Sequence, residues 1–428
     1  MDDLDHPNTK SYSIQSLRSI PSRIKYFPDT IRETFIVKLS SVRLTGRSIH
    51  YPNCLLQTGQ TVMNPYDERV MSLQKDTFYD GDEWTTTNQV RVIQTVHDPV
   101  FFFVYNVDNY YHFLYDTLPV LVGYFFLKET IPTLQLVVQT SHPSKKDLPN
   151  FVTEMLEGLG IQSYRMAEPN TVYEQMFIGT SLTHGRCSNS PPSPQAYSIW
   201  SRFQFPSQSR VKRFYVSRRS WLHGQTANMG TNYTTRRKCI NETALVNLLK
   251  QYGIVEVFTE CLSTESKVAL FAQAELVVGV IGGGMCNLLF SPQTTKSVCI
   301  VTPEFLTINE RFKYSMDHTQ ITYLDCTNHI KSPYKYTLYT RVKVINPNSP
   351  AFGQIGEIEE YLRDAYCVRM SSNDIAGFSQ DFELEARVLQ EWELSPLDGG
   401  LNSPYSCDLA QVEAHLQSLG LKKDTESD

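Results

Sequence analysis

The sequence predicts an α/β protein with two Rossmann-like domains that face each other across a cleft, followed by a C-terminal extension. Strand-like and helix-like patterns alternate over residues 85–180 and again over residues 213–301. Such alternation is typical of parallel sheets covered by helices. Residues 185–210 separate the two blocks and hold four prolines among several serines, which favours a linker.

The chain has 428 residues, enough for two or three domains. After residue 330 the alternation weakens, and acidic stretches at 355–366 and 381–393 predict helices there. The expected parts are a loosely ordered N-terminus (1–30), a first Rossmann-like domain (31–205), a second one (206–330) and a partly helical extension (331–428).

Each element follows from a local pattern. Strands are expected where β-branched and aromatic residues cluster, and helices where apolar residues recur every three or four positions. Asn241 is expected to cap a helix whose apolar stripe ends at Gly253. The predicted strands are 90–96, 100–107, 134–139, 172–178, 213–217, 254–258, 276–280 and 298–301, and the other main helices are 109–126, 146–159 and 263–274.

Composition excludes some classes of function. The chain carries 39 basic and 45 acidic residues, and a net charge of −6 disfavours binding to nucleic acid. No run of 18 apolar residues predicts a transmembrane segment, and the first residues do not resemble a secretory signal. We therefore expect a cytoplasmic protein, or a Golgi or ER-lumen protein if an anchor was lost. The nine cysteines contain no C-x-x-C pair and predict neither a zinc site nor a disulfide framework.

The first candidate site is the segment NYYHFLYDTLP, which directly follows the apolar strand PVFFFVY. Asn109, His112 and Asp116 are three and four positions apart, so they share one helix face. Their place after a strand is where α/β proteins usually bind ligands. Asp116 could orient His112 as a base or take a proton itself. A structural interpretation, in which Asn109 only caps the helix and the other two only pair, is about equally favoured.

The second candidate site is a glycine turn, Gly282-Gly283-Gly284, between a strand and a short helix. Outward N–H groups and the helix dipole make such a turn suited to a phosphate. With Asn287 in the third position and Glu304 further on, it approximates a dinucleotide fingerprint. That fingerprint normally opens its domain, and here two strand–helix units precede it. A nicotinamide-dependent oxidoreductase is therefore a weaker alternative, and a turn needed only for packing is another.

Basic residues lie close to the glycine turn in the predicted sheet. Arg218 and Arg219 follow the strand at 213–217, where a bound diphosphate would need a counter-charge. We expect one of the pair to be a ligand. Asp80-Gly-Asp82 could hold a divalent metal, as in metal-dependent sugar transferases, but its polar surroundings favour an exposed acidic turn.

Together these motifs resemble glycosyltransferase family 61. NYYHFLYDTLP matches the family's N-x-x-H-x-x-x-D element, YVSRR its strand-S-R-R segment, and RRKCINETALVNLL its Asn-Glu-led helix. VGVIGGGMCNLLF matches the family's glycine element in Gly279, Gly282, Asn287 and Phe290. The likeness covers roughly residues 95–330. It departs where the family has His and Ala, because this chain has Ile281 and Gly283.

The resemblance implies a GT-B fold and an inverting transfer from a nucleotide sugar, commonly UDP-linked, to a hydroxyl of a glycan or glycoprotein. No cofactor or essential metal is implied. The first block would bind the acceptor, positioned by Asn109 and Tyr111, and the second block the donor. Asp116 is the first candidate for the base and His112 the second. The implied donor-binding residues are Arg218, Arg219, Gly282, Gly283, Gly284, Asn287 and Glu304. Because Ile281 cannot hydrogen-bond a donor, a non-catalytic carbohydrate- or nucleotide-binding relative is the main alternative.

Overall fold

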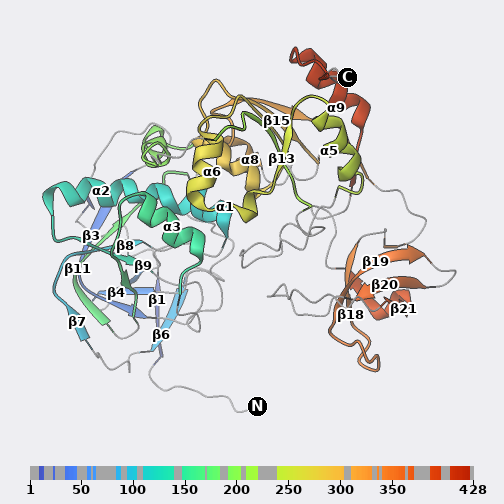
Figure 1. The fold of residues 1–428 in the computed structure, drawn as a ribbon. Helices are drawn as coiled ribbons and strands as arrows, with labels where there is room; N and C mark the ends of the chain where they lie inside the picture. Colours follow the sequence, from blue (N-terminus) through green and yellow to red (C-terminus); the bar gives the residue numbers. More distant parts are fainter. Residues whose placement is uncertain are drawn as a thin grey trace. The chain divides into compact units, whose positions relative to one another are not determined.

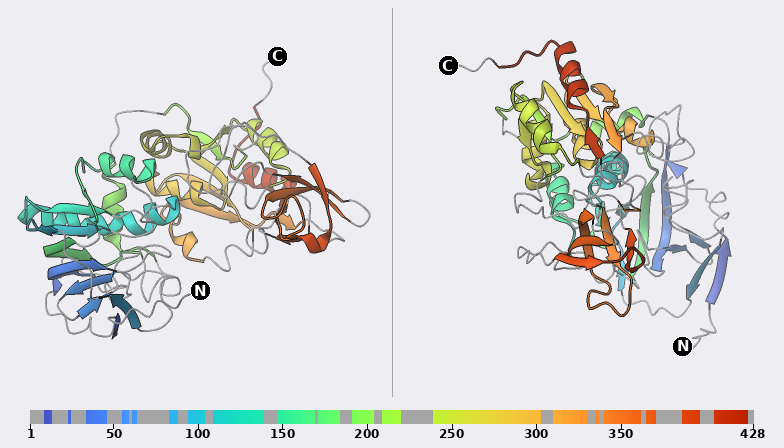
Figure 2. Two further views of the ribbon diagram at one scale, coloured as in Figure 1. Left: turned by 90° about the horizontal axis from the view of Figure 1, so that it is seen from below. Right: turned by 90° about the vertical axis from the view of Figure 1, so that its right-hand side faces the viewer.

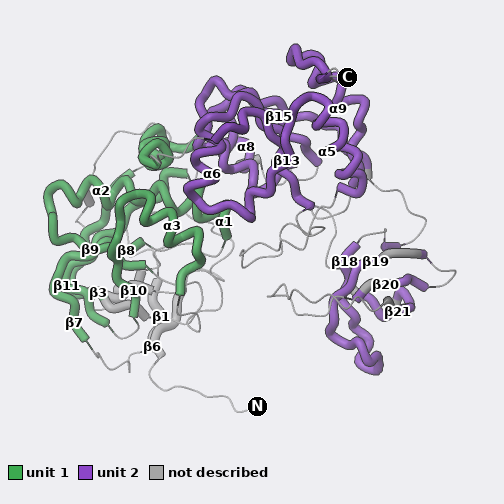
Figure 3. The backbone as a smooth tube through the Cα atoms, viewed as in Figure 1, with its two compact units in different colours: residues 1–205 green, residues 206–428 purple. Residues whose placement is uncertain are grey.

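The computed structural model divides the chain into two compact units, residues 1–205 and 206–428 (Figure 3). The structure describes residues 9–13, 23–24, 34–45, 55–58, 61–63, 83–87, 94–103, 109–138, 147–168, 171–183, 191–203, 209–219, 239–302, 310–329, 335–336, 340–361, 365–370, 386–396 and 405–424.

Unit 1 contains a mixed nine-stranded sheet (Figure 1). Its parallel part has the order β10-β9-β8-β11, and β11 then pairs antiparallel with β3, so that Gly179 lies opposite Ile36. The expected parallel sheet is therefore only part of this sheet. The strands are β2 (Arg23–Ile24), β3 (Ile36–Thr45), β4 (Leu55–Thr58), β5 (Thr61–Met63), β7 (Gln94–Val96), β8 (Val100–Phe103), β9 (Gln135–Val138), β10 (Arg165–Met166) and β11 (Thr171–Gly179), and a separate pair is formed by β1 (Thr9–Ser13) and β6 (Glu83–Thr87).

Strand β8 forms the centre of the unit 1 core. Its residues Phe101, Phe102 and Phe103 are all fully buried, as expected for a central strand covered on both faces. The helical segment after β8 is continuous but irregular. It runs through α1 (Tyr110–His112), a π-helical turn (Phe113–Thr117), a 3₁₀ turn (Leu118–Val120) and α2 (Leu121–Thr130). The remaining helices are α3 (Asn150–Gly158), a 3₁₀ turn (Pro194–Ala196) and α4 (Tyr197–Trp200).

Unit 2 contains the cleaner parallel sheet, in the order β13-β12-β14-β15-β16. In chain order this is 2-1-3-4-5, a doubly wound arrangement whose order reverses between β12 and β14. The strands are β12 (Arg213–Val216), β13 (Val255–Val257), β14 (Leu276–Val280), β15 (Lys296–Ile300) and β16 (Gln320–Leu324), and the helices are α5 (Glu242–Lys250), α6 (Thr264–Phe271), α8 (Glu310–Tyr314) and 3₁₀ turns at Thr259–Cys261 and Gly283–Phe290.

Alternate residues of the strands cover the two faces of this sheet. Tyr215 and Val278 belong to a core cluster with Leu245 and Leu249 of α5, whereas Phe214 packs edge-on against Phe271 of α6 at a ring distance of 5.0 Å. Because neighbouring strand residues point to opposite faces, α5 and α6 cover opposite sides.

The described residues between 340 and 396 lie mainly in strands, so the helices predicted at 355–366 and 381–393 are wrong wherever the structure describes them. The described part forms a five-stranded antiparallel sheet of β18 (Arg341–Val344), β19 (Ile355–Tyr361), β20 (Tyr366–Met370), β21 (Ala386–Leu389) and β22 (Leu394–Pro396), with a 3₁₀ turn at Glu391–Glu393. A register shift between Ile358 and Glu360 interrupts the alternation that would have revealed β19.

The last of the described helices is one that the sequence pattern did not place. Strand β23 (Tyr405–Cys407) pairs with β17 (Thr327–His329), and α9 (Leu409–Ser418) then lies beside α5 (Figures 1 and 2). Val412 and Leu416 of α9 are buried in the core cluster of the parallel sheet. The end of the chain therefore completes the core of unit 2.

Candidate active site

In unit 1, a histidine–aspartate pair begins the helical segment after β8. Asn109 caps α1, and its Oδ1 accepts a hydrogen bond from the His112 backbone N–H at 3.3 Å. His112 Nδ1 lies 2.7 Å from Asp116 Oδ2. The Asp116 side chain is fully buried, whereas 21% of the His112 side chain is exposed. The predicted side chains are thus brought together, with the imidazole on the solvent side of the carboxylate.

The other oxygen of Asp116 is held by a residue that sequence reasoning missed. Thr183, just beyond β11, donates its hydroxyl hydrogen to Asp116 Oδ1 at 3.2 Å, and its own N–H donates to Ser181 Oγ at 3.2 Å. Strands β8 and β11 are parallel neighbours, so their carboxyl ends meet at one edge of the sheet. The available signal was the group of hydroxyl residues Thr180, Ser181 and Thr183 that follows the neighbouring predicted strand.

The π-helical turn around Asp116 is supported by aromatic packing. Trp200 Nε1 donates to the carbonyl oxygen of Leu114 at 3.0 Å, and the Tyr115 ring stacks on Trp200 with 6° between the planes. Tyr111 stacks on Tyr115 and lies edge-on to His112, with ring distances of 5.7 and 5.2 Å. Single π turns often occur at functional sites because they redirect side chains. Here the stacked rings hold the segment that carries the pair.

This geometry can orient a proton acceptor. With its Nδ1–H donated to Asp116, a neutral imidazole carries its lone pair on Nε2. The anionic neighbour also stabilises the imidazolium that forms when Nε2 takes a proton. A pair used only for structure would show the same hydrogen bond, but it would not need an imidazole that is partly open to solvent above a fully buried carboxylate.

In unit 2, Arg218 and Gly282 lie at the point where the strand order reverses. Arg218 follows β12 and Gly282 follows β14, and these strands are parallel neighbours. A Cβ atom on Gly282 would stand 2.5 Å from Nη1 of Arg218, so the guanidinium rests directly on the glycine backbone. Glycine at 282 therefore lets the guanidinium approach the main chain, and a methyl group there would displace it. Crevices at such reversal points are the usual ligand sites of open α/β sheets.

A buried glutamate organises the turn that carries Arg218. Glu242, at the start of α5, is 5% exposed. Its Oε1 accepts hydrogen bonds from the Arg218 backbone N–H (2.9 Å), Tyr215 Oη (2.9 Å) and Ser217 Oγ (3.1 Å). Burial raises the pKa of Glu242, and these hydrogen bonds act in the opposite direction. Sequence reasoning noted the Asn-Glu helix start but did not assign Glu242 this role.

Arg219 has a different environment from its neighbour. Its Nε and Nη2 lie 2.5 and 2.6 Å from the two carboxylate oxygens of Glu256, and Nη1 donates to Thr243 Oγ1 at 3.0 Å. The hydrogen bond with Glu256 raises the pKa of Arg219. Such a fork-to-carboxylate pair joins β13 to the end of β12. Of the two predicted arginine ligands, Arg219 is thus held by a carboxylate, whereas the guanidinium of Arg218 lies against the glycine turn.

The rest of the glycine element packs inward. Asn287 is fully buried and donates through Nδ2 to the Gly284 carbonyl oxygen at 2.8 Å, so it holds the turn from the protein interior. A Cβ on Gly284 would meet Val216 Cγ1 at 2.8 Å and Thr259 Oγ1 at 2.9 Å. Ile281 is fully buried, and its N–H donates to the Ile300 carbonyl oxygen at 2.9 Å. The side chain at 281 is thus part of the core, which weakens the argument that isoleucine there alters donor contact.

Two expectations fall on residues outside the described ones: Glu304, proposed for the donor ribose, and the Asp80-Gly-Asp82 metal motif. Within the described residues, no group of three or more His, Cys, Asp or Glu side chains is arranged to hold a metal ion. None of the described helices is long and apolar enough to cross a membrane.

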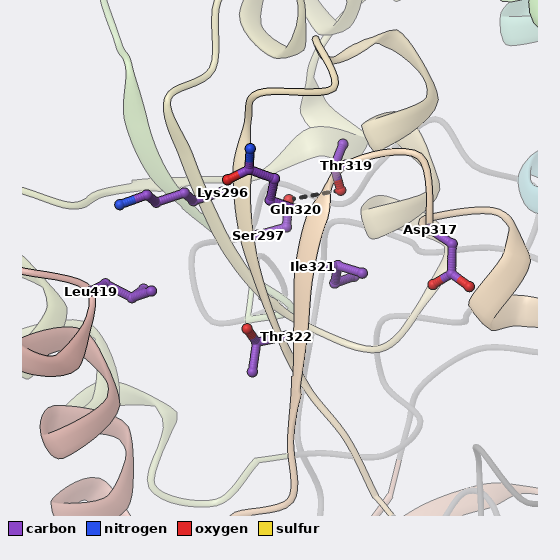
Figure 4. A pocket seen from close by; sticks show the side chains of 8 residues that line it. All are labelled: Lys296, Ser297, Asp317, Thr319, Gln320, Ile321, Thr322 and Leu419. Atoms are coloured by element: carbon purple, nitrogen blue, oxygen red, sulfur yellow. Dashed lines mark hydrogen bonds between the residues drawn. The ribbon is translucent and has the colours of Figure 1, made fainter.

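A pocket of about 460 Å³ lies at the amino ends of β15 and β16 (Figure 4). It is lined mainly by polar side chains: Lys296, Ser297, Asp317, Thr319, Gln320, Ile321, Thr322 and Leu419. Arg218 and Gly282 follow the carboxyl ends of their strands, at the opposite edge of the sheet. The pocket contains none of the predicted site residues.

The part of the chain that holds most of the two clusters matches a known family. Residues 110–298 match the model of the family described as Glycosyltransferase 61. This segment belongs to glycosyltransferase family 61. It begins one residue after Asn109 and contains His112, Asp116, Arg218 and the glycine turn. The chain therefore carries a glycosyltransferase domain of mixed α/β structure, as its motifs predicted. Among curated proteins, none matches the chain significantly.

Proposed function

We propose that the protein is an inverting glycosyltransferase of the GT-B type that moves a sugar from a UDP-linked donor to a hydroxyl of a glycan or glycoprotein. The observation that carries the donor side of this proposal is the Arg218 guanidinium resting on Gly282 at the strand-order reversal. In this proposal unit 2 binds the donor and unit 1 supplies the base.

The donor diphosphate is assigned to the Arg218 turn and the backbone of Gly282–Gly284. A guanidinium can bind two phosphate oxygens at once, and glycine lets phosphate approach the main chain. The positive charge stabilises the diphosphate that leaves with the electron pair of the broken glycosidic bond. The arginine and the main-chain amides thus supply the electrostatic role that a metal plays in metal-dependent transferases.

The base is assigned to His112, with Asp116 as the residue that orients it. Nε2 accepts the proton of the acceptor hydroxyl while the oxygen attacks the anomeric carbon from the side opposite the diphosphate. Asp116 was the first choice from sequence because a carboxylate can act alone. Its burial and the contacts of both its oxygens, with His112 and Thr183, favour the reverse assignment.

Thermal stabilisation by ligands tests the donor class. UDP, GDP, CMP and NADH are compared, first without metal and then with Mn²⁺. A ligand at 100 times its Kd stabilises a protein by about 2.7 kcal/mol, so binding shifts the midpoint visibly. We expect UDP to shift it without metal. A preferential shift with NADH supports the oxidoreductase alternative, and a shift only with Mn²⁺ supports a metal-dependent transferase.

A matched pair of variants localises the site. Arg218→Met removes the guanidinium at the carboxyl end of β12, and Arg213→Met removes one at the amino end of the same strand, where Arg213 is half-exposed and pairs with Glu275 at 3.7 Å. We expect Arg218→Met to weaken UDP binding about 10- to 100-fold, the usual cost of a charged hydrogen-bonding partner. Arg213→Met should bind UDP like the wild type. Equal affinity in all three proteins contradicts the assignment.

A further inference from the structure

Three buried thiols meet in unit 2, where the end of the chain joins the parallel sheet. Cys239 precedes α5, Cys326 follows β16 and Cys407 ends β23; they are 8%, 2% and 4% exposed. The sulfur atoms of Cys239 and Cys407 lie 3.5 Å apart although 168 positions separate them in sequence. Cys407 also hydrogen-bonds to Cys326. None of these thiols is used by the proposed mechanism.

Main-chain contacts and the Asn241 side chain hold the segment that carries Cys407 beside Cys239. We call residues 405–424 the C-terminal strap. Tyr405 of the strap forms a parallel bridge with Cys239 and accepts a hydrogen bond from the Ile240 N–H at 2.9 Å. The sequence predicted that the Asn241 side chain caps α5. In the structure it makes no capping hydrogen bond, and its amide group binds the strap instead. Its Nδ2 donates to the Cys407 carbonyl oxygen at 2.8 Å, and its Oδ1 accepts from the Cys407 N–H at 2.9 Å.

We propose that Cys239 and Cys407 form a disulfide that fastens the C-terminal strap to the parallel sheet. Bonded sulfurs lie about 2.0 Å apart, so the two thiols need to close by roughly 1.5 Å. The bridge between Cys239 and Tyr405 and the two hydrogen bonds between Asn241 and the Cys407 main chain already hold the two segments side by side, which favours this bond. Sequence reasoning missed the pair because only the fold brings positions so distant in sequence together.

The bond is formed by exchange with a small disulfide such as oxidised glutathione. The Cys407 thiolate attacks one glutathione sulfur, giving a mixed disulfide and releasing one glutathione thiolate. The Cys239 thiolate then attacks the Cys407 sulfur and releases the second. The two protein thiol protons pass to the two released thiolates. The protein is oxidised by two electrons and the glutathione disulfide is reduced by two.

The timing follows from burial. Contact with Cys239 and Cys326, together with burial, raises the pKa of Cys407, so its thiol stays protonated in the folded protein. A protonated, buried thiol reacts slowly with an external disulfide. Cys407 belongs to the strap, so it meets Cys239 only when the strap packs beside α5. We therefore expect oxidation during folding rather than afterwards.

The disulfide would form close in sequence to the residue that holds the proposed donor turn. Cys239 lies three positions before Glu242, the residue that holds the Arg218 backbone. The disulfide also encloses β13 to β16 and the antiparallel sheet in one loop. A long loop closed by a disulfide limits the unfolded chain and so stabilises the folded one. The disulfide itself does not depend on the proposed catalytic function.

Peptide mapping of the wild-type chain tests the pairing without any substitution. The full chain is unfolded with reductant, refolded with oxidised glutathione, alkylated and digested without reduction. We expect one cross-linked peptide pair that joins Cys239 to Cys407 and weighs two hydrogens less than its parts, with Cys326 alkylated. Alkylation of both Cys239 and Cys407, or a peptide that joins Cys326 to Cys407, overturns the proposal.

Thermal midpoints provide a second measurement. The oxidised wild type should melt roughly 5 to 10 °C above the reduced protein, the shift expected for a disulfide closing a long loop. Cys261→Ser changes an exposed thiol and should keep this difference. Cys239→Ser should lose it. A difference that persists in Cys239→Ser contradicts the proposal.

Discussion

The polar clusters of the two units are built in opposite ways. In unit 1, side chains hold one another: both oxygens of the buried Asp116 are occupied, by His112 and Thr183, on an irregular helical turn. In unit 2, regular strands place a main-chain turn, and Glu242 and Gly282 present the guanidinium of Arg218. The first arrangement suits a group that must move a proton, and the second suits the binding of an anion.

The largest effect is expected from removing the imidazole. His112→Asn should lower the rate of sugar transfer by roughly 10²- to 10⁴-fold, the usual contribution of a positioned base. Affinity for UDP should stay within about twofold, because the donor turn belongs to the other cluster. Transfer is measured with a radiolabelled UDP-sugar panel, and UDP affinity by thermal shift.

A second histidine–carboxylate pair serves as the control. His97 Nδ1 lies 2.8 Å from Glu174 Oε1, but both side chains are well exposed, so His97→Asn should transfer like the wild type. Asp116→Asn should reduce transfer less than His112→Asn, since the imidazole remains. If Asp116→Asn abolishes transfer while His112→Asn retains it, the carboxylate is the base and the comparison of the two clusters must be revised.

An intermediate effect is expected from two glycines of the same turn. Gly282→Ala places a methyl group against the flexible end of Arg218, so the guanidinium moves away and UDP affinity should fall about tenfold. Gly284→Ala places it against the packed side chains of Val216 and Thr259, so it should cost about 1–3 kcal/mol of stability. Calorimetry of both variants separates the two effects. Unchanged UDP affinity in a folded Gly282→Ala protein argues against the Arg218 assignment.

The sequence could predict features that depend on local spacing. The four-residue step from His112 to Asp116 and the strand–glycine–helix pattern at Gly282 both follow from the geometry of single elements. Partners from distant elements could not be derived this way. Thr183 reaches Asp116 only through the pairing of β8 with β11, and Glu256 reaches Arg219 only through the pairing of β12 with β13.

Local sequence patterns also fail to predict the structure where a tertiary contact overrides the usual residue preference. Strand β3 belongs to the N-terminal half of unit 1, and its antiparallel pairing with β11 has no counterpart in a simple strand–helix repeat. In β19, three glutamates among seven residues favour a polar helix, and a register shift breaks the alternation of polar and apolar residues that would have indicated a strand. Asn241 fits the usual residue preference for a helix cap, yet its amide bonds to Cys407. In each case a tertiary contact outweighs the local preference.

The smallest effects should distinguish the two carboxylates of unit 2 by the sign of their pH dependence. Burial raises the pKa of Glu242 above its ordinary value of 4.5. The folded protein then binds this proton more tightly than the unfolded chain does. The stabilising contribution of Glu242 to the unfolding free energy is therefore present below pH 4.5, and it is lost as the pH rises through the pKa of Glu242 in the folded protein. Burial also acts to raise the pKa of Glu256, but the hydrogen bonds and the charge of Arg219 lower it overall. Its contribution is present above pH 4.5 and is lost as the pH falls.

Glutamine variants measured over a range of pH test this difference. Relative to the wild type, the unfolding free energy of Glu242→Gln should improve from pH 4.5 to neutrality, because the variant no longer has to bury a carboxylate. The unfolding free energy of Glu256→Gln, relative to the wild type, should fall as the pH rises to 4.5 and should stay below the wild-type value at higher pH, because the ion pair with Arg219 is missing. Each change should be on the order of 1 kcal/mol. If both variants follow pH in the same direction, Glu242 is held as a paired anion like Glu256, and its burial beneath Arg218 serves charge balance rather than the shape of the turn.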